Sequence, residues 1–404
     1  MDWGKIQKIN RTEIESKLSQ IEEILISQKE AFESGQGLMG GKLGIALFFL
    51  YYAKMTNRQK PYDFGVELIS KVFDDINNGF NYHTHAGGLA GIGAILTLLT
   101  EADLLDADLN EILNGLDEYL YTLMISEIRN GNYDFLHGAV GLGFYFLKRN
   151  TKDSKNYLAE FIHELNTIAT KDEEGIRWLS FLKNTKQIKG FNISLSHGLA
   201  SIIVFLSKVY SAGIVRDKTG ELLSGAVKYL LNQQQDTSEN ISNFPSYVCE
   251  TEPSSYSRLA WCYGDLGIGT ALYVAGLNAN NEDWKEKGIE VVLHSTKRRE
   301  EKVTGVVDAC LCHGTAGIAH MYNRMYYYTG IYEFSEAATY WFEQTLQMAK
   351  FEDGLAGYKV WKTPERGGFQ NEYGFLEGIA GIGLAFISAI SNIEPEWDEC
   401  LFLS

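Results

Sequence analysis

Hydrophobic and polar positions define two kinds of segment along the chain. One kind is apolar almost throughout, as in residues 45–52 and 92–99, and this is typical of a helix buried on most sides. The other kind places apolar residues at three- and four-residue steps beside charged ones, as in Ile14 to Ile26 and Tyr340 to Met348. That spacing predicts a helix with one solvent-exposed face. Because the two kinds alternate, we expect buried inner helices and amphipathic outer helices.

A glycine motif precedes each strongly apolar segment. It consists of a glycine, two residues, a small residue and a branched apolar residue, and it recurs seven times at spacings of 47 to 66 residues. Only the fourth copy replaces its second glycine, with Ser201. Each spacing accommodates two helices and their connections, which is the pattern of helical repeats that share one core. The seven copies begin at Gly41, Gly88, Gly138, Gly198, Gly264, Gly314 and Gly378.

Seven such units predict an all-α fold, an α/α toroid of helical hairpins with an inner and an outer ring. An open solenoid would show the same repeat, so closure is a hypothesis. Helix packing explains most of the glycines, and we expect crowded backbones and a left-handed turn where each inner helix begins. No proline-rich or low-complexity linker divides the sequence, and this predicts a single domain over residues 1–404.

Three polar, turn-rich segments are longer than a tight connection between helices requires. They are residues 170–192, 232–257 and 352–371. We interpret them as candidate lids or peptide-binding loops.

Composition narrows the class of protein. Asp and Glu number 52 against 36 Lys and Arg, a formal charge of −16, so the average surface repels nucleic acid and anionic membranes. The longest apolar run, residues 45–53, is far shorter than the roughly 20 residues that span a bilayer. Residues 1–5 lack a basic stretch followed by an apolar core. Five cysteines suit reduced thiols or a metal better than a disulfide framework. We therefore expect a soluble, cytoplasmic protein with no membrane span and no nucleic-acid partner.

Two cysteines and a histidine share the register of the glycine motif. Cys262 and Cys312 each stand two places before the first glycine of their copy, and His313 stands one place before it. Neighbouring copies should therefore present these side chains at one rim. Thiolate and imidazole are ligands that zinc prefers, and three protein ligands leave a fourth position open, as in catalytic sites. The sequence predicts one zinc ion per chain.

Other interpretations of the same residues are open. The cysteines could be ordinary buried thiols beside a core histidine, although the shared register favours a metal. Cys310 lies two residues from Cys312 and could compete as a ligand. It falls out of register with Cys262, so we do not expect Cys310 to be a metal ligand.

Three sequence blocks resemble the signatures of the lanthionine synthetase C-like family. They are Trp-Cys-Tyr-Gly at 261–264, Cys-His-Gly at 312–314 and Ser-His-Gly-Leu-Ala at 196–200. The resemblance extends from about Gly37 to Gly383 and includes the glycine repeat. A chain of this length resembles the class I bacterial lanthipeptide cyclases in particular. It implies an α/α toroid and one catalytic zinc. Some relatives carry a small β extension, which this sequence does not place.

The family resemblance also implies an activity and partners. The expected reaction is a Michael addition of a peptide cysteine thiol to dehydroalanine or dehydrobutyrine, which gives lanthionine or methyllanthionine rings. The expected substrate is a dehydrated lanthipeptide precursor with leader and core. The expected partners are a dehydratase and an exporter, in a complex at the inner face of the membrane.

By the same resemblance, four further residues receive roles. His197 would protonate the enolate, Arg258 would stabilise its charge, and Asp134 would orient His197 or share in proton transfer. Tyr263 would donate a hydrogen bond near the sulfur. The alternatives are a rim histidine, a helix cap at Asp134 and a packing tyrosine. His137 has no counterpart in the family pattern.

Two other functions compete with the cyclase. A prenyltransferase-like α/α barrel also uses zinc to activate a thiol, but such sites typically include a carboxylate ligand, and only Glu377 stands in the ligand register. A non-catalytic zinc- or glutathione-binding scaffold would keep the fold and the metal. The joint presence of His197, Arg258 and Asp134 favours the cyclase.

Overall fold

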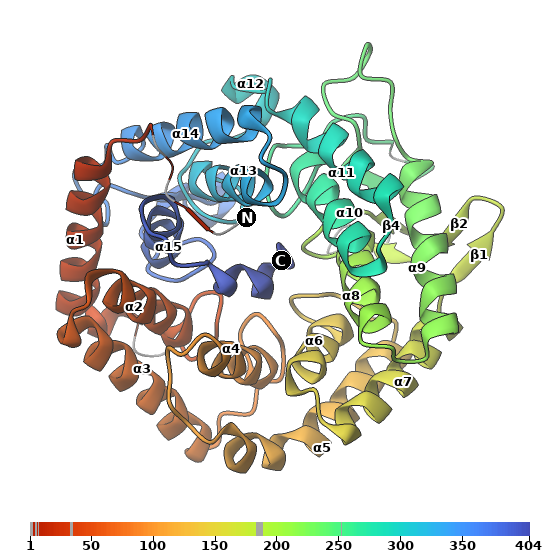
Figure 1. Cartoon of the computed structure of the whole chain (residues 1–404), viewed down its shortest axis with the longest axis horizontal. Coiled ribbons are helices and arrows are strands. Elements are labelled where there is room, and N and C mark those ends of the chain that lie inside the picture. The colour runs from red at the N-terminus through yellow and green to blue at the C-terminus, as the bar shows by residue number, and fades with distance from the viewer. Residues whose placement is uncertain (1–2, 5, 7, 33–34, 183–188, 252) are drawn as a thin grey trace.

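Two concentric rings of helices make up the protein (Figure 1). The computed structural model describes residues 3–4, 6, 8–32, 35–182, 189–251 and 253–404. In this part of the chain the inner ring contains α2 (Lys42–Thr56), α4 (Leu89–Glu101), α6 (Ala139–Arg149), α8 (Leu199–Ser211), α10 (Asp265–Ala279), α13 (Thr315–Thr329) and α15 (Ile379–Ile390). The outer ring contains α1 (Arg11–Ser27), α3 (Gln59–Asn77), α5 (Leu109–Arg129), α7 (Lys152–Thr167), α9 (Arg216–Leu231), α11 (Glu282–Ser295) and α14 (Tyr332–Gln347). The predicted α/α toroid is confirmed.

Burial follows the sequence pattern of each ring. Every residue of α15 is buried, as a helix that packs on all sides requires. In α1 the buried apolar residues are Ile14, Leu18, Ile21 and Leu25, which lie at three- and four-residue steps along one face. Outer helices therefore cover the inner ring with one face and meet solvent with the other.

Backbone hydrogen bonds close the ring. In six of the seven units, the residue two places before the first glycine donates its N–H to the carbonyl of the corresponding residue in the next unit, with N···O distances from 2.8 to 3.3 Å. The last of these bonds, from Leu376 N to Met39 O at 2.9 Å, joins the seventh unit to the first. The bonds run from Met39 to Ala86, Ala86 to Leu136, Ser196 to Cys262, Cys262 to Cys312, Cys312 to Leu376 and Leu376 to Met39. Closure is thus observed, and the turns of successive units are held in one register.

The glycines act by close packing more than by left-handed backbone. A Cβ atom on Gly91 would lie 1.9 Å from the carbonyl oxygen of His85, so no side chain fits there. The expected left-handed turn at the first glycine is wrong for six of the seven copies, whose φ angles are negative and extended. Gly264 alone among them has a positive φ, +91°. Close contact with the backbone of the turn just before the helix, and not backbone handedness, requires most of these glycines.

The C-terminal segment fills the centre of the ring (Figure 1). It contains a 3-10 helix, η3 (Glu396–Leu401), whose residue Trp397 is fully buried. Trp261, which precedes α10, donates its indole N–H to the carbonyl of Leu401 at 2.8 Å. From α13, Arg324 Nε donates to Asp398 Oδ2 at 2.8 Å. The segment therefore ties separate units of the inner ring together.

Truncation of Trp397 should destabilise the whole toroid. We expect Trp397→Ala to lower the free energy of unfolding by about 3 to 5 kcal/mol, because it empties a large buried site at the centre. Urea unfolding monitored by circular dichroism measures this loss. Trp284→Ala, on the partly exposed outer helix α11, is the matched control and should cost clearly less; equal losses would contradict the central role of η3.

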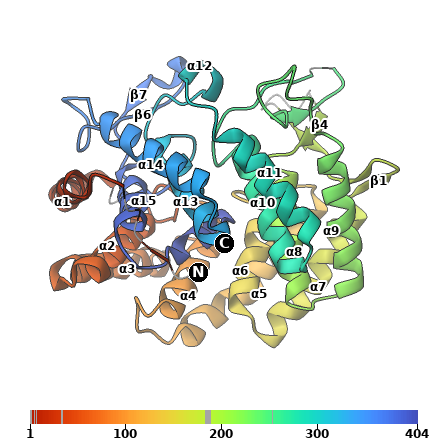
Figure 2. The same ribbon diagram turned by 45° about the horizontal axis from the view of Figure 1, so that its top comes forward.

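Short strands lie in the long connections. The strands β1 (Thr170–Asp172) and β2 (Gly175–Arg177) form one hairpin, and β6 (Val360–Trp361) and β7 (Phe369–Gln370) form another. A three-stranded antiparallel sheet joins β3 (Ser180–Phe181), β4 (Lys189–Asn192) and β5 (Tyr247–Val248). Figure 2 shows β4, β6 and β7 on one side of the helical ring. The three candidate loops thus carry small β elements; residues 183–188 of the first loop lie outside the described residues.

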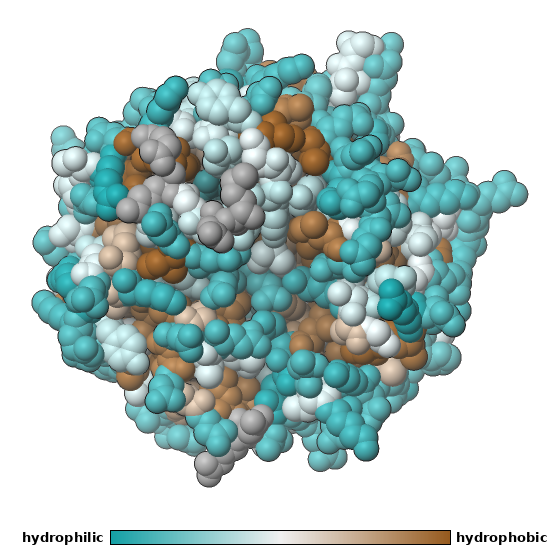
Figure 3. Space-filling model, viewed as in Figure 1, coloured by the Kyte–Doolittle hydropathy of each residue, from teal (hydrophilic) through white to brown (hydrophobic). Residues whose placement is uncertain are grey.

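Polar side chains dominate the face of the molecule in Figure 3, where hydrophobic residues form separate patches. Within the described ranges, no helix combines the length and the apolar character needed to cross a bilayer. The strongly apolar segments of the sequence are core helices of the ring.

Candidate metal centre and catalytic residues

The turns that precede the inner helices carry the predicted site residues. In each turn the first glycine of the motif is the N-cap of the helix. Cys312 and His313 precede α13. Cys262 precedes α10, and His197 precedes α8. Because the turns share the ring of backbone hydrogen bonds, these residues lie at the same end of the toroid.

Cys262, Cys312 and His313 lie together. One ligand atom from each residue, the two Sγ atoms and a ring nitrogen, lies within 4.8 Å of the other two. The N–H of Cys262 donates to the carbonyl of Cys312 at 3.3 Å, which fixes the spacing of the two turns. Two thiols and an imidazole are a donor set that zinc prefers, with a fourth position left for water or substrate. The residues therefore fit a zinc ion, and their role as ligands stays a prediction.

The two thiols hold their protons unequally. A hydrogen bond from Cys312 lowers the pKa of Cys262 to about 6, with help from His313 and against the effect of burial. The same hydrogen bond raises the pKa of Cys312 well above its usual value. Burial disfavours a charge on His313, yet Cys310 and Asp308 raise the pKa of His313 to about 12. The cluster thus favours one thiolate, and a metal ion would displace the remaining protons.

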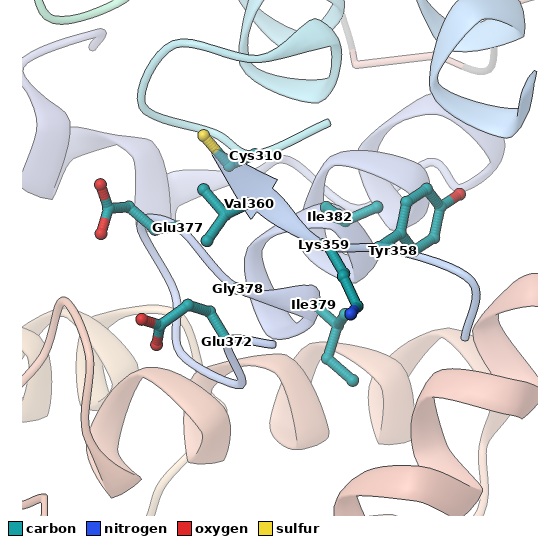
Figure 4. Close-up of a pocket in the computed structure, with 9 residues that line it drawn as sticks. All are labelled: Cys310, Tyr358, Lys359, Val360, Glu372, Glu377, Gly378, Ile379 and Ile382. Atoms are coloured by element: carbon teal, nitrogen blue, oxygen red, sulfur yellow. The ribbon is translucent and has the colours of Figure 1, made fainter. Parts of the chain in front are cut away.

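Cys310 belongs to a second group of polar atoms. Its Sγ, a carboxylate oxygen of Asp308 and a ring nitrogen of His313 also lie within 4.8 Å of one another. Burial raises the pKa of the Cys310 thiol to about 11. The cavity beside it has a volume of ≈ 10 Å³, room for one water molecule at most; Figure 4 shows Cys310 there next to Val360. A space of this size leaves no room for a substrate thiol beside Cys310.

Asp134 and His197 form a hydrogen-bonded pair across two units. His197 Nδ1 donates to Asp134 Oδ2 at 2.6 Å, although 63 residues separate them. The other carboxylate oxygen of Asp134 accepts from the backbone N–H of His137 at 2.8 Å, and the His137 ring lies 6.0 Å from the His197 ring. The N-cap of α6 is Gly138, so the helix-cap alternative for Asp134 is wrong. Asp134 thus forms hydrogen bonds both with its own turn and with the His197 ring of the next unit.

The charge of Asp134 controls the protonation of His197. Burial lowers the pKa of His197, but the hydrogen bond and charge of Asp134 outweigh burial, so this pKa lies above its usual value. In Asp134→Asn the negative charge is lost. We therefore expect the pKa of His197 to fall, and activity that needs protonated His197 to decline at a lower pH than in the wild type. NMR titration of the histidine rings measures the shift; an unchanged His197 titration would contradict this pairing.

Arg258 and Tyr263 lie beside the cysteine and histidine groups. Arg258 Nη2 donates to a backbone carbonyl at 3.1 Å, and its charge helps to lower the pKa of Cys262. The Tyr263 ring lies 6.4 Å from the His197 ring, and its hydroxyl accepts from Asn192 Nδ2 at 3.5 Å. The structure therefore brings all seven predicted site residues to one end of the ring.

Two neighbours of the site, Asn192 and Asp308, were not predicted from the sequence. Asn192 contacts Tyr263, and an oxygen of Asp308 lies 3.2 Å from His313 Nε2. Both stand six places before the first glycine of their copy, as Arg258 does. The register that identifies the ligands thus also contains the signal for these two residues.

Fold and site together define a class: a closed α/α toroid with a Cys–Cys–His group and an aspartate–histidine pair at one end. A sequence model described as lanthionine synthetase C-like protein matches residues 34–402. The chain belongs to the lanthionine synthetase C-like family, and the resemblance indicated by the signature blocks is confirmed.

Known relatives extend over almost the whole chain. Nisin biosynthesis protein NisC of Lactococcus lactis subsp. lactis is 25% identical over 423 residues, which cover 96% of this chain and 94% of that protein. Among solved structures, nisin cyclase superimposes with a TM-score of 0.76 at 19% identity and covers 95% of this chain and 97% of its own. The structural likeness confirms the toroid fold.

Proposed function

We propose that this chain is a zinc-dependent lanthipeptide cyclase. It would join cysteine thiols of a precursor peptide to dehydroalanine or dehydrobutyrine residues of the same peptide and so form lanthionine and methyllanthionine rings. The observation that carries the proposal is the Cys–Cys–His group beside the Asp134–His197 pair in a member of this family. The similarity to a nisin biosynthesis protein supports a lantibiotic product.

Different residues would carry out the two steps of the Michael addition. Cys262, Cys312 and His313 would hold the zinc ion, which when bound supplies a positive centre where an incoming thiol loses its proton. Addition of sulfur to the alkene leaves an enolate that needs a proton at its α-carbon. His197, whose protonated form is favoured by Asp134, would supply that proton.

Arg258 and Tyr263 would complete the site. The guanidinium of Arg258 offers a permanent positive charge to the enolate oxygen. Tyr263 lies beside the His197 ring and places a hydroxyl near the reacting sulfur. Both residues act on charge that develops during the addition.

The partners follow from the proposed reaction. The substrate is a dehydrated lanthipeptide precursor with its leader and core, which a dehydratase must supply and an exporter removes. We place the protein in the cytoplasm, in a complex with these partners at the inner face of the membrane.

Mass spectrometry of a dehydrated precursor peptide tests the proposal. The peptide is incubated with the protein and then treated with a thiol-alkylating reagent. Ring formation removes free thiols without changing the peptide mass, so we expect a product that takes up no alkyl group. Full alkylation with the zinc-loaded protein present would favour a non-catalytic scaffold instead.

A prenyltransferase-like site has less support. The carboxylate in ligand register, Glu377, forms a salt bridge with Lys362. An anion engaged in this way is a poor candidate for a metal ligand.

A further inference from the structure

The His313 ring lies between the two cysteines and a carboxylate. One of its nitrogens belongs to the group formed with Cys262 and Cys312. Its Nε2 atom lies 3.2 Å from Oδ2 of Asp308. A histidine that binds a metal through one nitrogen is neutral and carries a proton on the other, and a carboxylate facing that proton fixes both the tautomer and the ring orientation.

Asp308 is itself held rigidly. Its carboxylate is buried at 2% exposure. Oδ1 accepts from the backbone N–H of Cys310 at 3.1 Å, and Oδ2 accepts from the N–H of Trp361 in β6 at 2.9 Å. A side chain anchored at both oxygens loses little further freedom when it orients a partner.

We propose that Asp308 is the positioning residue of the metal centre: it accepts the Nε2 proton of His313 and so aims Nδ1 at the zinc ion held with Cys262 and Cys312. This inference rests on the proposed zinc site. Asp308 acts through His313 and does not touch the substrate.

The geometry favours this role over direct ligation by Asp308. Both oxygens already accept backbone N–H groups, and a metal ligated there would compete with them. Such a metal would also need Cys310, which lies beside β6 and a cavity of ≈ 10 Å³ (Figure 4). No peptide thiol can enter a space of that size.

The same carboxylate links the metal centre to an overlying hairpin. Oδ2 of Asp308 both faces His313 and receives the N–H of Trp361. The hairpin β6–β7 and the imidazole therefore share one anchor, so a substitution at Asp308 acts on both.

Zinc affinity separates this role from a purely structural one. We expect Asp308→Asn to bind zinc about 10- to 100-fold more weakly than the wild type, as loss of a carboxylate behind a histidine ligand typically does. Competition with a chromophoric chelator measures the dissociation constant without any activity assay. Thermal melting of the metal-free proteins, measured beside it, reports the cost of the altered loop.

Asp265→Asn is the matched control. Asp265 is also fully buried, and it accepts two backbone N–H groups, from Asn243 at 2.9 Å and Phe244 at 3.0 Å. It lies in a neighbouring unit and is not part of the metal cluster. We expect it to lower the melting temperature and leave zinc affinity unchanged. If both variants bound zinc as tightly as the wild type, the positioning role of Asp308 would be overturned and the zinc site would stand. If the wild type bound no zinc, the proposed zinc site itself would be overturned.

A measurement on the unmodified protein keeps the inference testable if Asp308→Asn does not fold. Nitrogen NMR of labelled histidine in the zinc-loaded wild type identifies which ring atom of His313 binds the metal. We expect metal at Nδ1 and a proton at Nε2. Metal at Nε2, or X-ray absorption showing a single sulfur ligand that Cys310→Ser removes, would assign the ion to the group of Asp308 and Cys310 and overturn the inference.

Discussion

A Cys262→Ala variant is expected to lose its zinc and, with it, ring formation. Only Cys312 and His313 would remain, fewer protein ligands than catalytic zinc sites use. An incoming thiol with an ordinary pKa of about 8.5 then stays mostly protonated at neutral pH. We expect zinc to fall from about one ion per chain to a small fraction of that. Elemental analysis of the protein and mass spectrometry of the alkylated peptide measure the two losses.

Cys249→Ala is the control for this prediction. Cys249 is also buried, but it lies just after β5, where its thiol donates to the carbonyl of Lys189. Its removal should leave zinc content and ring formation intact. Full zinc content in Cys262→Ala would show that Cys262 is not a zinc ligand. Loss of zinc from Cys249→Ala would show that zinc loss is not specific to the site.

The helical architecture could be predicted because the repeat makes the same packing demand seven times. Each inner helix begins against the backbone of the turn that precedes it, and at Gly91 the carbonyl of His85 leaves no room for a side chain. A constraint of that kind leaves a glycine in the sequence. It does not state the backbone angle, which is why the left-handed turn was correct only at Gly264.

Closure and the central segment could not be predicted in the same way. Closure depends on the last bond, from Leu376 to Met39, between residues that no local pattern connects. The segment around Trp397 follows the last copy of the repeat and has no register. Its place in the centre depends on contacts with helices far away in the chain, such as that of Asp398 with Arg324.

The site could be predicted as far as the register extends. Position relative to the first glycine of each copy is enough to predict that Cys262, Cys312 and His313 lie at one rim. The contact of Asp134 with His197 needed the family resemblance, because a carboxylate four places before a glycine is also explained by the N–H that it caps in its own turn. The role of Asp308 is equally ambiguous in the sequence, because a carboxylate at this position is also explained by the backbone N–H groups that it accepts.

The two halves of the site favour opposite protonation states. The cysteine pair favours a thiolate, because Cys312 lowers the pKa of Cys262 to about 6. The Asp134 carboxylate favours a protonated His197. A Michael addition needs a deprotonated sulfur and an acid at the same time. Separate turns of one ring supply these two conditions without neutralising each other.

His197→Asn is expected to retain zinc and lose most of the cyclase activity. The substitution removes the acid that would protonate the enolate and leaves the three proposed ligands in place. Loss of a general acid typically lowers the rate by about 10² to 10⁴ fold. Single-turnover cyclisation followed by mass spectrometry gives the rate, and elemental analysis of the same sample gives the zinc content.

His163→Asn, on the exposed side of α7, is the matched control and should cyclise at the wild-type rate. The comparison separates catalysis from folding, because both variants replace a histidine by the same residue and both should melt close to the wild type. A His197→Asn protein that cyclises at the wild-type rate would show that the proton comes from elsewhere. If His197→Asn instead lost zinc, the histidine would support the metal site and the assignment of a proton donor would be wrong.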